Sequence, residues 1–305
     1  SAERIRTERV SRGGQAPDAV VLGDHHVNAF TQRPIFLVGC PRSGTTLLQS
    51  LLAAHPLIAS FPESKFFEYL IPADRQLAKR LGLVSRRFRP RMAVFFREVG
   101  CPDLMAELPN SPFVGAYPKK FVQILDKLTA AQGKQLWVEK TPGHIYCLND
   151  IERFLKQAKF IHLCRQGADV VASLYDVTQK YPKAWGGHPW DLNRCVDRWA
   201  TAVNISRQKQ GQPNHKVLTY EDLVADPEKQ LKRVCEFIGV EFMPSMIKDY
   251  SQSAQRLAMS RVGRNVETVI QSPKTGKFYK LFDQVQQQQV LRGIAASGVD
   301  LDAIS

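Results

Sequence analysis

Residues 34–46 read Pro34-Ile35-Phe36-Leu37-Val38-Gly39-Cys40-Pro41-Arg42-Ser43-Gly44-Thr45-Thr46, an apolar run that ends in a polar turn. A continuous apolar run bounded by proline and glycine is typical of a strand buried on both faces, as in a parallel sheet. Residues 46–55 continue as an apolar stretch that stops before Pro56, which is typical of a helix. This part of the chain therefore predicts a strand, a loop and a helix in succession.

Short apolar runs elsewhere predict further strands of the same sheet, over residues 57–61, 136–139, 160–164 and 216–219. Amphipathic stretches predict helices between them, over residues 74–83, 119–131, 151–157, 168–175, 192–209 and 227–238. Strands that alternate with helices require crossover connections and give a mostly parallel sheet. We therefore expect an α/β, three-layer fold in which helices cover both faces of a mostly parallel central sheet.

The turn after the first strand has the composition of an anion-binding loop. Four residues separate Gly39 from Gly44, and two threonines follow them. Glycine lets the backbone approach a ligand closely, and the next helix presents unpaired N–H groups and the positive end of its dipole. Ser43, Thr45 and Thr46 add hydroxyl donors. The loop thus predicts a cradle for a phosphate-like anion and a P-loop-type fold.

The cations near this loop differ from those of a nucleoside triphosphatase. Such an enzyme carries Gly-Lys-Ser/Thr, with the lysine on the terminal phosphates and the hydroxyl on Mg²⁺. This chain has Gly44-Thr45-Thr46 instead, and its cation, Arg42, precedes the second glycine. The run over 160–164 ends in Arg165 rather than in an acidic Mg²⁺ partner, and no Cys/His set has metal-ligand spacing. We therefore expect phosphate binding without a metal.

Composition limits the partners of the chain. Apolar residues make up 44% and charged residues 23%, as in an ordinary globular protein, which excludes disorder, collagen and coiled coil for the whole chain. Lys and Arg number 42 against 29 Asp and Glu, a net charge of +13 that favours an anionic partner. No basic stripe interleaved with aromatics and no helix-turn-helix pattern is present, so we expect no nucleic-acid partner.

The ends and the middle of the chain differ in character. Residues 1–33 are polar and predict a leader or linker, with one domain over 34–305. Residues 86–118 show no clear period and read as an insertion that covers the substrate. Six scattered cysteines favour free thiols, and no apolar run reaches the ~20 residues of a membrane helix. We expect a cytoplasmic protein, with a targeting or anchor segment upstream of Ser1 as the alternative.

Two of these elements resemble a known family when they are taken together. The strand, Pro-Arg-Ser-Gly-Thr-Thr loop and helix are similar to the 5′-phosphosulfate loop of sulfotransferases that use 3′-phosphoadenosine-5′-phosphosulfate (PAPS). Residues 160–173 resemble the 3′-phosphate site of that family, with Arg165 at a strand end and Ser173 eight residues later. An arginine and a serine so placed can converge on one phosphate.

Three further segments resemble the same family. Tyr220, in a Tyr-Glu-Asp-Leu element, matches a tyrosine near the adenine, and Lys140, in Lys-Thr-Pro, matches a lysine that points at the sulfuryl group. Residues 265–279 resemble the late basic loop over the nucleotide, whose residues here include Lys274, Gly276 and Lys277. Phe278 stands where that loop usually has tryptophan. The resemblance covers about residues 34–285 and is nearest to the bacterial and tyrosylprotein branch.

The resemblance implies sulfuryl transfer from PAPS to a hydroxyl acceptor by in-line displacement, which leaves adenosine 3′,5′-bisphosphate (PAP). Arg42 and Lys140 are then the cations near the transferred group. Glu63 matches the glutamate that serves as base in the tyrosylprotein branch, and His144 is the alternative base. The first loop and the strand over 57–61 are consecutive, so adjacent strand ends are expected to bring Glu63 near the loop.

Two other functions compete with this hypothesis. They are a P-loop kinase or triphosphatase, which Mg²⁺-dependent ATP turnover would indicate, and a non-catalytic anion-binding module, which tight polynucleotide binding would indicate. The acceptor stays open among small-molecule alcohols, tyrosine, glycans and carrier-bound acyl groups.

Overall fold

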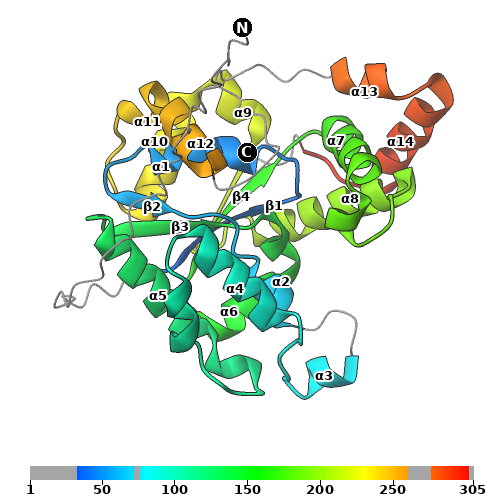
Figure 1. Cartoon of the computed structure of the whole chain (residues 1–305). Coiled ribbons are helices and arrows are strands. Elements are labelled where there is room, and N and C mark those ends of the chain that lie inside the picture. The colour runs from blue at the N-terminus through cyan, green and yellow to red at the C-terminus, as the bar shows by residue number, and fades with distance from the viewer. Residues whose placement is uncertain (1–32, 72–75, 260–275, 302–305) are drawn as a thin grey trace, which may run out of the picture.

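The computed structural model describes residues 33–71, 76–259 and 276–301. In these residues five strands form one sheet, with the order β2-β3-β1-β4-β5 and parallel pairing throughout (Figure 1). The strands are β1 (Ile35–Gly39), β2 (Ile58–Ser60), β3 (Leu136–Lys140), β4 (Lys159–Cys164) and β5 (His215–Thr219). The expected parallel α/β sheet is confirmed, and each strand begins and ends close to its predicted bounds.

Helices connect and cover the strands. In the first half of the chain these are α1 (Thr45–Ala53), α2 (Phe66–Leu70), α3 (Gln76–Arg80), α4 (Phe88–Glu98), α5 (Pro118–Ala131) and α6 (Leu148–Phe154). The second half contributes α7 (Gly167–Lys180), α8 (Leu192–Lys209), α9 (Tyr220–Ala225), α10 (Pro227–Ile238), α11 (Ser245–Lys248), α12 (Tyr250–Met259), α13 (Gly276–Leu281) and α14 (Gln284–Ala296). Short 3₁₀ helices are η1 (Pro102–Glu107), η2 (Val114–Ala116), η3 (Pro142–Cys147) and η4 (Pro182–Trp185). None of the described helices has both the length and the hydrophobicity that crossing a membrane requires.

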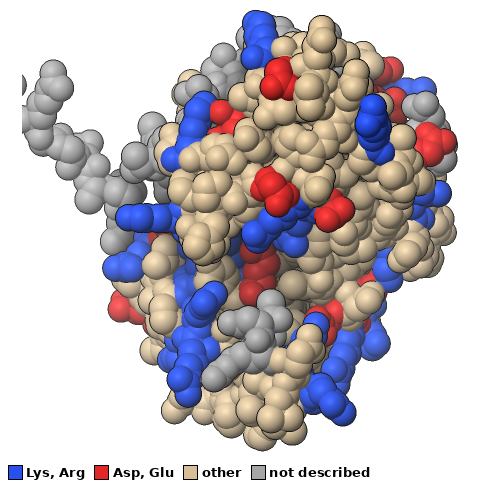
Figure 2. Space-filling view, turned by 90° about the vertical axis from the view of Figure 1, so that its right-hand side faces the viewer, with Lys and Arg blue, Asp and Glu red and all other residues tan. Residues whose placement is uncertain are grey.

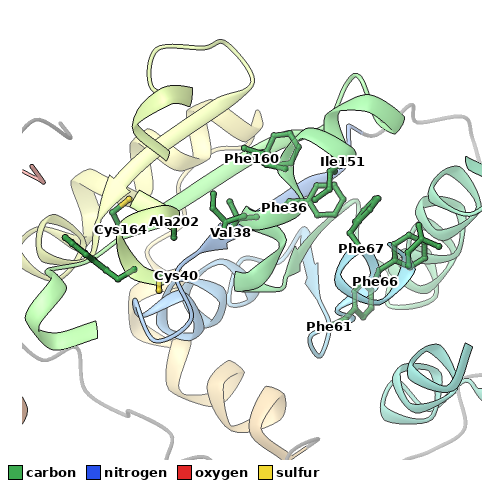
Figure 3. Close-up of a cluster of buried hydrophobic side chains, with 14 of the residues drawn as sticks. Phe36, Val38, Cys40, Phe61, Phe66, Phe67, Ile151, Phe160, Cys164 and Ala202 are labelled. Carbon is green, nitrogen blue, oxygen red and sulfur yellow. The ribbon is translucent and has the colours of Figure 1, made fainter. Parts of the chain in front are cut away.

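Both faces of the sheet are buried, because alternate residues of each strand point to opposite sides. Phe36 and Val38 of β1 pack in one core with Phe66, Phe67 and Phe160 (Figure 3). Ile35 and Leu37 pack in a second core, under α1 and α10. The continuous apolar sequence of β1 follows from this double burial.

The strand order corrects one expectation. β2 does not lie beside β1, because β3 pairs with both of them. β1 and β2, which follow one another in the chain, are therefore separated in the sheet by β3. The carboxyl ends of β1, β2 and β3 still share one edge, because all three strands are parallel.

The segment over 86–118 has more structure than its sequence suggested. Phe88, Met92, Phe95 and Phe96 are fully buried along one side of α4, a helical spacing that the sequence analysis did not detect. α4 packs against α2, which follows the end of β2. One side of α4 therefore belongs to the hydrophobic core; a substrate-covering role for the segment stays a prediction. The predicted leader over 1–33 lies, apart from Arg33, outside the described residues.

The six cysteines are free thiols, as the sequence predicted. Burial raises the pKa of Cys40 and of Cys164 to about 12. Both thiols therefore stay protonated near neutral pH.

A buried histidine pair joins β4 to β5. His162 Nε2 lies 2.9 Å from His215 Nδ1, and His162 Nδ1 lies 3.1 Å from the hydroxyl oxygen of Ser206. Burial lowers the pKa of His162 well below its ordinary value, and the nearby His215 lowers it further. Burial also lowers the pKa of His215, although Glu152 opposes this shift.

These lowered pKa values predict loss of stability in acid. The unfolded chain binds protons at these histidines below about pH 6.5, whereas the folded chain does not, so stability falls as pH drops below that value. The slope contributed by one such proton is at most about 1.4 kcal/mol per pH unit. Urea unfolding between pH 7 and pH 5 should give a shallower slope for His162→Gln than for the wild type. The exposed His188→Gln serves as control, and equal slopes for all three proteins would contradict the expectation.

Candidate functional site

The loop between β1 and α1 has the backbone of an anion cradle. Arg42 and Gly44 both have positive φ, 78° and 94°, a conformation that costs energy for a non-glycine residue such as Arg42. A Cβ atom at Gly39 would lie 2.4 Å from the carbonyl oxygen of Leu163, so β4 approaches this glycine too closely for a side chain. Leu47 and Leu48 donate the first backbone hydrogen bonds of α1, both to the carbonyl of Gly44. The N–H groups that precede them lie in the first turn, at the N-terminal end of the helix beside the loop.

The hydroxyls of the loop are placed to donate to a ligand. Ser43 is fully buried, and its hydroxyl has no hydrogen-bond partner among the described residues. A buried hydroxyl without a partner is costly, and a phosphate oxygen would satisfy it. Thr45 is also buried, whereas Thr46 reaches the end of β3 through Lys140. The loop therefore fits the phosphate-like group that its sequence predicts.

The two predicted anion sites meet directly. Arg42 donates from Nε to the hydroxyl of Ser173 on α7 at 3.0 Å, although the two residues are 131 positions apart. Arg165, at the end of β4, lies 3.1 Å from Asp169, and its Nε is buried without a hydrogen-bond partner in the described structure. The Arg165 guanidinium lies 4.2 Å from the ring centre of Tyr220. The carboxyl ends of β1, β4 and β5 thus bring together four residues that the sequence predicts for the nucleotide: Arg42, Arg165, Ser173 and Tyr220.

The predicted lysine and the predicted base, Lys140 and Glu63, also meet. Lys140 is the last residue of β3, and its Nζ lies 2.6 Å from Oε1 of Glu63. The same Nζ donates to the hydroxyl of Thr46 at 3.5 Å. Both members of the ion pair are buried, with side chains 2% and 8% exposed. Lys140 therefore connects the anion loop to the glutamate that the sequence analysis named as base.

His144 lies apart from this ion pair. Its ring is fully buried, and Nε2 accepts a hydrogen bond from the backbone N–H of Phe67 at 3.2 Å. Nδ1 lies 3.0 Å from Oε2 of Glu139. Both ring nitrogens thus face protein groups, whereas Glu63 contacts the cation at the loop.

The late basic segment is described only in part. Lys274 lies outside the described residues, whereas Gly276 and Lys277 begin α13. Lys277 pairs with Asp176 at 2.7 Å, one turn beyond Ser173 on α7. Phe278 is buried against Phe282, so it anchors α13 to the core.

Sequence analysis missed the residues that support the base loop. Arg91 of α4 donates to the backbone carbonyls of Glu63 and Ser64, and Glu139 accepts from Ser64. The buried helical spacing of the aromatic residues around Arg91 is the signal that could have placed it on a helix beside the site. Figure 2 shows acidic and basic side chains gathered around a hollow on the side of the molecule that faces right in Figure 1. Among the described residues, no group of three His, Cys, Asp or Glu side chains is arranged to hold a metal ion.

Gly44 gives a stability test of the cradle. A Cβ atom there would lie 2.3 Å from the ring of Tyr220, whereas Gly133, also at positive φ, has nothing within 4 Å of such an atom. In Gly133→Ala the free energy of unfolding should fall only by the cost of the left-handed backbone, about 1–2 kcal/mol. In Gly44→Ala the free energy of unfolding should fall by roughly 1–3 kcal/mol more, because the added methyl group overpacks against the ring of Tyr220. Urea unfolding measures both, and the excess should shrink in a Tyr220→Ala background; equal losses would contradict the close approach of Tyr220.

The chain is similar in sequence to several known proteins. Relatives include protein-tyrosine sulfotransferase A of Caenorhabditis elegans, 23% identical over 77% of this chain and 57% of its own length. Another is protein-tyrosine sulfotransferase 1 of Danio rerio, 24% identical over 77% of this chain and 62% of its own length. The nodulation protein NoeE of Sinorhizobium fredii is 26% identical over 68% of this chain and 50% of its own length. The chain thus spans roughly half to three fifths of these curated relatives.

Solved structures share the fold. The sulfotransferase domain of the Synechococcus PCC 7002 olefin synthase is 23% identical, with a TM-score of 0.54 over 92% of this chain and 98% of that domain. Mouse sulfotransferase SULT7A1, solved in complex with PAP, is 14% identical, with a TM-score of 0.50 over 89% of this chain and 85% of its own. The family model described as "Sulfotransferase family" matches residues 34–244, more than half of the chain. The chain therefore belongs to the sulfotransferase family.

Proposed function

We propose that the chain transfers the sulfuryl group of PAPS to a hydroxyl acceptor by in-line displacement and releases PAP. The observation that carries the proposal is the series of contacts from the exposed Thr46 through the buried Lys140 to the buried Glu63. It joins an anion loop, a cation and a carboxylate at one sheet edge. Sulfuryl transfer needs a cation beside the donor and a base beside the acceptor hydroxyl, and both groups must lie next to the bound donor.

The two ends of the donor have separate partners in this proposal. Ser43, Thr45 and Thr46, with the start of α1, would hold the 5′-phosphosulfate, because hydroxyls and helix N–H groups suit a phosphate-like anion. Arg165 and Ser173 would hold the 3′-phosphate, and the unpartnered Nε of Arg165 supports that role. Arg42 contacts Ser173 and so lies between the two sites. Tyr220 would lie near the adenine, and the late segment with Lys274, Gly276 and Lys277 would cover the nucleotide.

The reacting groups follow from the ion pair. Glu63 is present in the pair as a carboxylate, the form that can accept the acceptor's hydroxyl proton. As the acceptor oxygen bonds to sulfur, the bond from sulfur to the bridging phosphate oxygen breaks. Lys140 and Arg42 would stabilise the charge on the sulfuryl group and on the departing phosphate. His144 fits the base role less well, because both of its nitrogens face protein groups.

The acceptor class is tested by activity against four kinds of hydroxyl. PAP formation is measured with a small-molecule alcohol, a tyrosine peptide, a glycan and a carrier-bound hydroxyacyl group. We expect turnover with one class, and EDTA should leave the rate unchanged because no step uses a metal. Turnover of ATP that requires Mg²⁺, without PAP formation, would favour the kinase alternative.

The 3′-phosphate site predicts a strong preference for PAP over AMP. Loss of a phosphate from a charge-assisted site should cost on the order of 2–4 kcal/mol, roughly 30- to 1000-fold in affinity. Calorimetry should show that preference for the wild type and for the surface control Arg292→Ala. Arg165→Ala should bind PAP and AMP with similar affinity. Equal affinities in the wild type would contradict the role of Arg165 and Ser173.

The base predicts a selective loss of rate. Glu63→Gln keeps the shape of the side chain but removes its basicity, so kcat should fall about 10²- to 10⁴-fold. PAP affinity should stay within a few-fold of the wild type, because the nucleotide contacts are elsewhere. Glu107, which pairs with Lys127 at 2.8 Å, offers a matched control, and Glu107→Gln should keep full activity. An unchanged kcat in Glu63→Gln would remove Glu63 from the mechanism.

A further inference from the structure

The connection between β2 and α2, which carries Glu63, is held by side chains from one short stretch of β3 and η3. The N–H of Ser64 donates to Glu139 at 3.2 Å, and that of Lys65 donates to Thr141 at 3.1 Å. The N–H of Phe67 donates to His144 Nε2 at 3.2 Å. Two amides of the connection and one in the first turn of α2 are therefore bound by the side chains of Glu139, Thr141 and His144.

The three accepting side chains also bind one another. Thr141 donates its hydroxyl proton to Oε1 of Glu139 at 2.6 Å, and the hydroxyl of Ser64 donates to the same oxygen at 2.7 Å. His144 Nε2 accepts an N–H and so carries no proton, which places the proton of the neutral ring on Nδ1, 3.0 Å from Oε2 of Glu139. Burial raises the pKa of Glu139, but the nearby His144 and the hydroxyls of Thr141 and Ser64 outweigh it, so the pKa is lowered. Glu139 is thus held as a buried carboxylate by three hydrogen bonds to Oε1, with His144 Nδ1 3.0 Å from Oε2.

The carbonyl side of the same connection is held from α4. Arg91 donates from Nε to the carbonyl of Ser64 at 3.1 Å and from a second nitrogen to the carbonyl of Glu63. The peptide that carries Glu63 is therefore fixed on both of its hydrogen-bonding sides. The residue next to Glu139 along β3 is Lys140, so the group that holds the connection and the group that pairs with Glu63 share one strand end.

Resting on the proposed function, we propose that Glu139, Thr141 and His144 are positioning residues, which hold the Glu63 peptide against the strand end that carries Lys140. They touch backbone amides and each other. A carboxylate displaced by about 1 Å from its productive place can cost on the order of 10²-fold in rate. The network fixes the separation of Glu63 from Lys140 without contacting the reacting atoms.

Two substitutions disturb the network with little change in shape. In Glu139→Gln the amide nitrogen faces either Nδ1–H of His144 or the donors from Ser64 and Thr141, so one donor always meets another. Thr141→Val removes the hydroxyl in an isosteric change, whereas Thr141→Ser retains it. Glu152→Gln is the matched control, because Glu152 accepts from His215 at 2.8 Å near the opposite end of the strands.

Hydrogen–deuterium exchange of the ligand-free protein tests the network directly. The peptide spanning residues 61–70 should exchange faster in Glu139→Gln and Thr141→Val than in the wild type, Thr141→Ser and Glu152→Gln. Unchanged exchange in both disturbed variants would overturn the network. Because Thr141→Val keeps the volume of the core, it gives a result even where Glu139→Gln does not fold.

Kinetics tests the consequence for catalysis. Thr141→Val should lower kcat by about 10- to 100-fold while KM for PAPS and PAP affinity change by only a few-fold. Thr141→Ser should restore kcat, and Glu152→Gln should lower stability without changing kcat. If Glu63→Gln lowers kcat but Thr141→Val and Glu139→Gln do not, the positioning role is wrong and the proposed base stands. If Glu63→Gln leaves kcat unchanged, the base is wrong, and the positioning role, which depends on it, falls too; the exchange data then show only whether the network exists.

Discussion

Parallel pairing on both sides of β1 is the constraint from which the site follows. A strand that pairs on both edges and is covered on both faces is largely apolar until near its end, and β1 is apolar throughout. Parallel neighbours end at the same edge, so the polar residues that follow β1, β3 and β4 are brought together there. Loop residues that are distant in sequence, such as Arg42 and Ser173, contact each other for this reason.

The buried charges at this edge oppose stability. Lys140 and Glu63 are removed from water, and the attraction within such a pair rarely exceeds the cost of desolvating both ions. Glu139 and His144 form a second buried pair on the next residue of the same strand. Two adjacent strand residues with buried ionisable side chains, Glu139 and Lys140, are more readily explained by chemistry than by folding energy. The arrangement is consistent with sulfuryl transfer, for which charge must be stabilised away from water.

Much of this architecture follows from local sequence. The apolar runs predicted every strand, since burial on both faces leaves a continuous signal, and the glycine spacing of 39–44 predicted the loop. The order of β1 and β2 could not be read in this way, because the choice of neighbour depends on long-range packing. The helix over 88–98 was missed, since prolines and arginines interrupt its aromatic pattern. The proposal prefers Glu63 to His144 partly because His144 accepts the backbone N–H of Phe67, a tertiary contact with no signature in the order of residues.

The two proposed halves of the site are distributed differently along the chain. Glu63, Lys140 and the positioning residues all lie between α1 and β4, whereas Arg42, Arg165, Ser173 and Tyr220 lie on either side of that interval. A single continuous stretch of the chain, from the end of α1 to the start of β4, thus contains the proposed base, the lysine that pairs with it and the residues that hold them. Replacement of this stretch by recombination would exchange the proposed base together with its supports, while the proposed nucleotide-binding residues on either side stay in place.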